Sequence, residues 1–114
     1  MKGELTWIEL SKIKFKNNIR TVRNLLHKGV FLAPCVKANA YGHGLLECAK
    51  IFVENGADWL CVDSVDEAIF LREHGIRTKM LIMGYVGPKD LHKAVQYNVR
   101  VFLYDYWDAR TLSR

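Results

Sequence analysis

The chain has 114 residues, 50% of them hydrophobic and 25% charged, which suits one small globular domain and excludes a disordered chain. Its formal net charge of +5 raises the possibility of a nucleic-acid partner, but acidic residues are interleaved with the basic ones and no aromatic residues punctuate the basic segment 12–23, so we expect a solvated helix face and no nucleic acid. No apolar run approaches the ~20 residues that a membrane span needs, and the amino terminus lacks the apolar core of a secretory signal; we therefore expect a cytoplasmic protein without a membrane partner.

The three cysteines argue against a disulfide framework and against a metal site. Their number is odd, and Cys35, Cys48 and Cys61 have no Cys-x-x-Cys spacing. We expect them to be small buried hydrophobic residues in a reducing compartment.

The first third of the chain predicts a short strand, a helix and a buried strand. Residues 6–10 alternate weakly and suit a short leading strand. Ser11 can cap a helix with apolar residues at helical spacing, and Gly29 is typical of its end. Residues 30–36 form an apolar run that predicts a strand buried on both faces, with an irregularity at Pro34, because proline has no amide hydrogen to give to a ladder.

Lys37 follows that strand and is the candidate functional residue. A glycine-flanked turn and a new helix come after it. In a sheet of parallel strands, ligands bind at the carboxyl edge, where the loops vary while the strands stay packed. A lysine amine sheltered at such an edge can lose its proton and attack a carbonyl group.

Three further strands and their helices follow in the same rhythm. We expect strands over 59–62, 80–83 and 99–103, and helices after residue 44, after Ser64, from Pro88 and from Asp105 to Leu112. Ser64 to Glu67 is typical of a capping box, in which Ser64 caps the third amide and Glu67 reaches back to the serine amide. The spacing of roughly 20 to 26 residues indicates right-handed βα units in a parallel sheet. An open doubly wound sheet and half of a (β/α)8 barrel, which closes with about 250 residues, both fit this rhythm.

The run from Val36 to Gly44, VKANAYGHG, resembles the signature of the alanine racemase family, whose lysine carries pyridoxal phosphate. Weaker similarities extend the resemblance over nearly the whole chain; they lie at residues 7–9, 56–60, 67–68, 71–72 and 81–84. The resemblance implies an α/β fold of parallel βα units that forms the first half of a TIM (β/α)8 barrel. Residues 1–114 are then the amino-terminal part of the pyridoxal-phosphate-binding barrel domain, and the second half-barrel and the β-rich carboxyl-terminal domain are absent.

The same resemblance implies a pyridoxal-phosphate-dependent isomerase that interconverts L- and D-alanine and supplies D-alanine for the bacterial cell wall. It implies a homodimer with a small amino-acid substrate, alanine or serine. Lys37 would hold the cofactor and act as one catalytic base, and the Tyr41 hydroxyl would donate to the cofactor phosphate. The base on the opposite face is a tyrosine of the partner subunit in this family, and no residue of this chain is assigned to it.

Two alternatives remain open at this point. One is a barrel protein that holds pyridoxal phosphate without turnover, although the lysine signature of such proteins differs. The other is an inactive truncated fragment, and we expect the 114-residue chain alone not to racemise alanine.

Other residues near the edge have simpler expected roles. Asn39 is expected to bond nearby backbone, and His43 to pack at the helix start or face solvent rather than act as an acid or base. Tyr85, Tyr104 and Tyr106 follow strand ends and are expected to pack in the core or at the rim.

Overall fold

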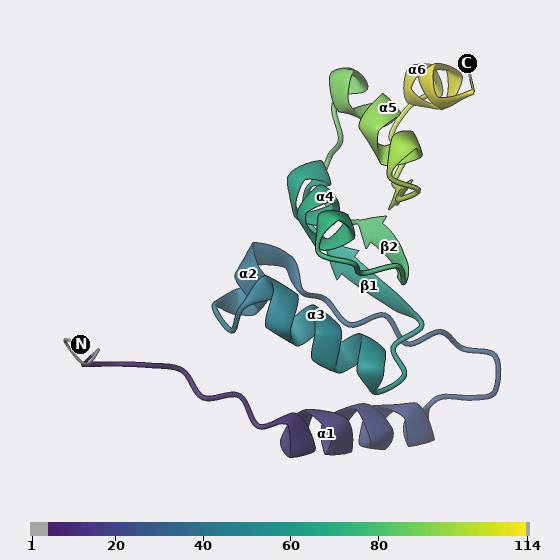
Figure 1. The fold of residues 1–114 in the computed structure, drawn as a ribbon. Coiled ribbons are helices and arrows are strands. Elements are labelled where there is room, and N and C mark those ends of the chain that lie inside the picture. The colour runs from purple at the N-terminus through teal and green to yellow at the C-terminus, as the bar shows by residue number, and fades with distance from the viewer. Residues whose placement is uncertain (1–4, 114) are drawn as a thin grey trace.

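The computed structural model describes residues 5–113, which form a chain of βα units (Figure 1). The described helices are α1 (Lys12–Leu25), α2 (Lys37–Tyr41), α3 (Leu45–Glu54), α4 (Val65–Glu73), α5 (Pro88–Gln96) and α6 (Tyr106–Leu112). The strands are β1 (Trp59–Val62), β2 (Lys79–Ile82) and β3 (Arg100–Val101). None of the described helices combines the length and the apolar character that crossing a membrane requires.

The three strands form one parallel sheet in the order of the chain, β1-β2-β3. Trp59 pairs with Lys79 at one end of the β1–β2 ladder, and Val62 pairs with Ile82 at the other. Helix α4 connects the first pair of strands and α5 connects the second pair. The expected series of parallel βα units is confirmed.

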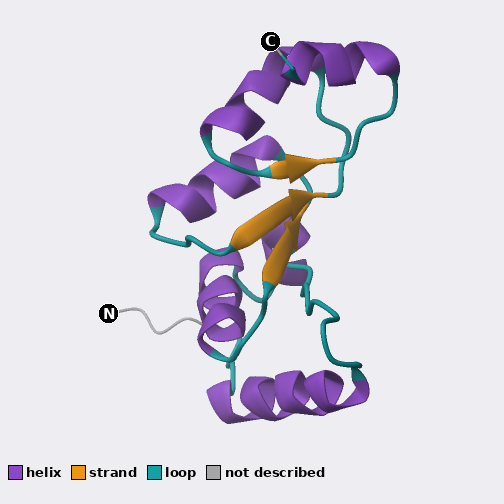
Figure 2. Cartoon of the chain, turned by 90° about the vertical axis from the view of Figure 1, so that its right-hand side faces the viewer, coloured by secondary structure: helices purple, strands orange, loops and turns teal. Residues whose placement is uncertain are grey.

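The hydrophobic core lies between one face of the sheet and the helices. Alternate residues of a strand point to the same face, so Leu60 and Val62 share one side. Both side chains are fully buried, and Met80 and Ile82 on the next strand are at most 1% exposed. In Figure 2 the strands lie in front of the helices, which shows that the opposite face of the sheet has no helix over it. The structure is accordingly flat, with extents of 49 × 45 × 21 Å.

The prediction of a buried strand over residues 30–36 is wrong, because this segment is not a regular strand and is not buried on both faces. This segment runs beside β1 and accepts hydrogen bonds at Leu32 from the Trp59 amide and at Pro34 from the Cys61 amide. Only Cys35 makes a bridge of strand type, with Cys61. Pro34 cannot donate the hydrogen bond that a continuous ladder needs. The segment is also the outermost one beside β1, which leaves Phe31 65% exposed.

Two other expected strands differ from the structure. Residues 6–10 form no strand, because their weak alternation meets no neighbouring strand, and Trp7 and Ile8 are exposed. The strand expected over 99–103 is reduced to β3, since its partner β2 ends at Ile82, which pairs with Val101.

The expected helix starts are confirmed at three serine or aspartate caps. Ser11, Ser64 and Asp105 accept hydrogen bonds from the amides of Lys14, Glu67 and Asp108. The second half of the capping box is wrong, however. Glu67 does not return to the Ser64 amide but accepts from the amides of Asp63 and Ala38. Helix α1 ends at Leu25, before Gly29.

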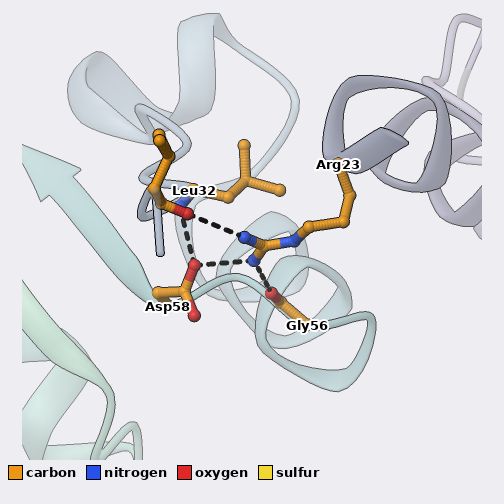
Figure 3. A network of polar contacts seen from close by, with 5 residues as sticks. Arg23, Leu32, Gly56 and Asp58 are labelled. Atoms are coloured by element: carbon orange, nitrogen blue, oxygen red, sulfur yellow. Dashed lines mark hydrogen bonds and ion pairs between the residues drawn. The ribbon is translucent and has the colours of Figure 1, made fainter. Parts of the chain in front are cut away.

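An ionic network joins α1 to the start of β1 (Figure 3). Arg23 Nη2 donates to Asp58 Oδ2 at 2.6 Å and to the Gly56 carbonyl at 2.7 Å. The same Asp58 oxygen accepts from the Leu32 amide at 2.7 Å. These contacts lower the pKa of Asp58 below its usual range, the Leu32 amide most and the Arg23 guanidinium next. Asp58 thereby fixes both α1 and the 30–36 segment against β1.

Candidate functional site

Lys37 lies at the carboxyl edge of the sheet, as expected from the sequence. It follows Val36, whose side chain is fully buried and whose amide donates to the Cys61 carbonyl of β1 at 2.8 Å. The Lys37 side chain is 35% exposed, and its Nζ lies 3.8 Å from Oδ1 of Asp63, the residue that follows β1. The hydrogen bond of Val36 to β1 thus holds the backbone next to Lys37, while the Lys37 amine stays accessible beside the Asp63 carboxylate.

The turn after Lys37 is left-handed. Ala38, Asn39, Ala40 and Tyr41 have φ between 51° and 56°, and Gly42 continues at 91°. The Ala40 amide donates to the Val36 carbonyl at 2.8 Å, which closes the turn onto the strand end. A non-glycine residue in this region costs about 1–2 kcal/mol, and such conformations concentrate at functional sites. The sequence predicted a turn flanked by glycine here but not its handedness.

Asn39 and His43 play the local roles that were expected. Asn39 Oδ1 accepts from the Leu45 amide at 2.9 Å and so satisfies a free amide in the first turn of α3. His43 is exposed, and its Nδ1 lies 2.9 Å from the Ala40 carbonyl, where the ring nitrogen must be the donor. Both side chains stabilise the turn that presents Lys37.

Tyr41 stands on the same turn and is 62% exposed. Its hydroxyl donates to the Cys35 thiol at 3.4 Å. This hydrogen bond, with smaller effects of burial and of the nearby Cys35 and Asp63, raises the pKa of Tyr41 above its ordinary value. The hydroxyl therefore remains a protonated donor at neutral pH, which a phosphate contact requires. That contact stays a prediction.

The carboxyl ends of the strands meet around these residues. Cys35 Sγ lies 4.0 Å from Met83 Sδ, just past β2. Gly84 follows, and a Cβ there would collide with the Asp63 carbonyl, so only glycine permits this approach of β2 to β1. Tyr85 and Tyr104 form an edge-to-face pair with ring centroids 5.7 Å apart. Tyr85, Tyr104 and Tyr106 are each more than 60% exposed, which places them at the rim and not in the core.

The three cysteines form no disulfide with one another, and they follow the expectation of burial only in part. All three are free. Cys48 and Cys61 are buried, and burial raises the pKa of each thiol, but Cys35 is half-buried beside Tyr41. Within residues 5–113, no three His, Cys, Asp or Glu side chains come together as metal ligands.

The sequence did not identify two acidic residues as part of this site. Asp63 faces the Lys37 amine, and Glu67 bonds the Ala38 amide at 2.8 Å. Asp63 directly follows a strand of a parallel sheet, and that position could have identified it. Glu67 was hidden because the capping-box pattern explained it locally.

Lys37 and Tyr41 have side chains of the kinds that could bind a small aldehyde with an anionic group. Lys37 offers an accessible primary amine that can condense with the aldehyde. Tyr41 offers a neutral hydroxyl donor on the same turn. Pyridoxal phosphate has an aldehyde and an anionic phosphate. Lys37 would hold the aldehyde, and Tyr41 would hold the phosphate.

Residues 10–114 match the family model described as "Alanine racemase, N-terminal domain". The alanine racemase of Listeria innocua is 44% identical over 111 residues, which cover 95% of this chain and 30% of that protein. The chain therefore spans about a third of the length of the curated relatives that it matches.

Solved structures show the same similarity in space. The alanine racemase of Oenococcus oeni superposes with a TM-score of 0.83 and 33% identity, over 91% of this chain and 30% of that one. A histidine racemase from Leuconostoc mesenteroides gives a TM-score of 0.82 and 25% identity, over 91% of this chain and 28% of that one. The arrangement of βα units is that of the amino-terminal part of a TIM barrel.

Proposed function

This chain belongs to the alanine racemase family, and from that premise we propose that residues 1–114 are the amino-terminal part of a pyridoxal-phosphate-dependent racemase that interconverts L- and D-alanine. The observation that carries the proposal is the position of Lys37. Its amine projects from the carboxyl edge of the sheet on the turn that bears the family signature. The second half of the barrel, a β-rich carboxyl-terminal domain and a homodimer are part of the same proposal.

Each residue of the site has a role in this proposal. Bound pyridoxal phosphate would supply an electron sink that makes the Cα proton of an amino acid acidic. Lys37 Nζ would hold the cofactor and move the proton on one face of Cα. Tyr41 would donate its hydroxyl to the phosphate, and Asp63 would hold the Lys37 amine between proton transfers. No residue of this chain is assigned to proton transfer on the other face of Cα.

Alanine is the substrate that the comparisons favour. The relatives between 37% and 44% identical carry the name alanine racemase, whereas the histidine racemase is 25% identical. Supply of D-alanine for a bacterial cell wall is part of the same proposal. Serine is the alternative, and competition between the two amino acids in a racemase assay of the complete enzyme distinguishes them.

The proposal is tested by trapping the cofactor on the protein. Pyridoxal phosphate is added, the adduct is reduced with borohydride, and the modified lysine is mapped by mass spectrometry. We expect a phosphopyridoxyl group on Lys37 that is lost in Lys37→Ala. Lys50→Ala, which removes an exposed lysine of α3, is the matched control and should leave the label in place. Label spread evenly over the surface lysines would contradict the proposal.

Turnover separates an enzyme from a non-catalytic cofactor carrier. We expect a polypeptide that includes the rest of the barrel and the second domain to racemise alanine. We expect residues 1–114 alone not to do so, because one of the two proton-transferring groups is missing. Label on Lys37 without racemisation by the longer polypeptide would favour the carrier.

A further inference from the structure

One carboxylate joins the turn that follows Lys37 to the segment that follows β1. Glu67 Oε1 accepts from the Ala38 amide at 2.8 Å, and Oε2 accepts from the Asp63 amide at 2.7 Å. Glu67 itself lies in the first turn of α4, where the Ser64 hydroxyl caps its amide. Two segments that are far apart in the sequence are thereby tied to one rigid helix.

The first of these bonds fixes the backbone of Lys37. The Ala38 nitrogen lies in the rigid peptide plane that also holds the Cα atom and the carbonyl group of Lys37. A hydrogen bond to this amide therefore sets the direction in which the chain leaves Lys37. Ala38 is also the first residue of the left-handed turn, with φ 51°. Strained backbone of this kind persists only where surrounding contacts hold it.

The second bond fixes the residue that faces the amine of Lys37. Asp63 is held through its amide by Glu67, and its carboxylate lies 3.8 Å from Lys37 Nζ. Glu67 thus acts on both ends of the lysine, on its backbone through Ala38 and on its amine through Asp63. A carboxylate suits this task, since it accepts two charge-assisted hydrogen bonds at once.

We propose that Glu67 is a positioning residue for Lys37, which sets the orientation of the amine toward the cofactor aldehyde without touching the reacting atoms. This inference rests on the proposed function of Lys37. Glu67→Gln tests it, because the amide keeps the shape of the side chain but presents an NH2 group to one of the two backbone N–H donors.

The main measurement is the initial rate of borohydride-trapped labelling of Lys37 by pyridoxal phosphate, relative to the other lysines. Glu67→Gln is expected to lower this rate about tenfold, the effect of losing one hydrogen bond to a charged group. A second measurement needs no cofactor: native-state hydrogen exchange of the Ala38 amide should become about tenfold faster in the same variant.

Two variants control for charge and for stability. Asp66→Asn removes a carboxylate from the same helical turn, where Asp66 is exposed. Ser11→Ala removes the cap of α1, a helix that does not contain Glu67. Both variants should label Lys37 within about twofold of wild type, even where Ser11→Ala lowers the urea midpoint.

The outcomes separate the inference from the proposed function. If wild type carries no label on Lys37, the proposed function fails and the inference fails with it. If wild type is labelled and Glu67→Gln labels equally fast, only the inference is overturned. It is also overturned if Ser11→Ala reduces the labelling as much as Glu67→Gln does, because the effect is then one of stability.

Discussion

The backbone at single residues determines how this protein presents its lysine. Four consecutive non-glycine residues from Ala38 to Tyr41 adopt positive φ, where the Cβ atom of each lies close to the following carbonyl oxygen. The turn is held from outside by the Glu67 carboxylate and from within by the Ala40 amide, which bonds the Val36 carbonyl. The sequence pattern predicts an ordinary turn here, and the backbone strain at positive φ is visible only in the structure.

Glycine at position 38 should stabilise the protein. Ala38 is exposed, its φ is 51°, and glycine reaches this conformation without steric cost. Relief of strain should exceed the added entropy of the unfolded chain, so we expect Ala38→Gly to raise the free energy of unfolding by about 0.5–1 kcal/mol. Urea denaturation measures it. The same change in right-handed α6, Ala109→Gly, should lower stability by about 1 kcal/mol, and equal signs for the two variants would refute the argument.

Asp58 should make stability depend on pH in the acid range. Its folded-state pKa is lowered, so the stability it contributes is present above its ordinary pKa of about 3.9 and is lost as the pH falls through the folded-state value. Asp58→Asn should lower the thermal midpoint at pH 7 and flatten its change below about pH 4. Thermal unfolding followed by circular dichroism between pH 7 and pH 3 measures both effects. A variant that keeps the full acid dependence of wild type would show that other carboxylates cause it.

At the scale of elements, a buried arginine connects α4 to the loops around the next two strands. Arg72 is 8% exposed and donates to the carbonyls of Tyr97, Ile76, Thr78 and Asn98 at 2.8–3.0 Å. Burial lowers the pKa of Arg72 below its usual value, and the neighbouring Arg77 adds to this shift. The helix end and the turns before β2 and β3 thus share one set of donors at the amino-terminal edge of the sheet, opposite Lys37.

Loss of these donors should destabilise the fold without affecting the candidate site. Arg72→Met keeps much of the side-chain volume but leaves four carbonyls without their partner, and we expect the free energy of unfolding to fall by about 2–4 kcal/mol. Arg77→Met, at an exposed position in the loop between α4 and β2, should change the free energy of unfolding by less than about 0.5 kcal/mol. Urea denaturation compares the two variants. Similar losses of unfolding free energy in both variants would mean that the hydrogen bonds of Arg72 do not stabilise the fold more than a surface arginine does.

At the scale of the molecule, the sheet is covered on one side only. Phe102 and Leu103, which follow β3, are each 48% exposed, and Met83, which follows β2, is 42% exposed. Trp59 on the uncovered side lies under the guanidinium of Arg100, at 4.9 Å from its ring centroid. Exposed apolar side chains and unpaired strand edges favour association with another surface.

We therefore expect residues 1–114 alone to self-associate. Sedimentation velocity over a range of concentrations should show species larger than the monomer of 13.2 kDa. Replacing Phe102 and Leu103 by serine should shift the distribution toward the monomer, because it removes exposed apolar surface next to β3. The matched change on the opposite end of the molecule, Leu25→Ser in α1, should leave it unchanged. A strictly monomeric wild type at all concentrations would contradict this prediction.

The sequence by itself determined the order of the βα units, the serine and aspartate helix caps and the place of the lysine before a turn, since these depend on local periodicity and on side chains that act within a few residues. Strand β1 and the starts of α1, α4 and α6 lie where the pattern predicted them. Only the tertiary structure decided which segments become strands, because a ladder needs a neighbour with free donors, and Pro34 and the end of β2 remove them. It also decided that Glu67 bonds Ala38 and that Asp63 faces Lys37, since these pairs are 29 and 26 residues apart in the chain and meet only when parallel strands align their carboxyl ends.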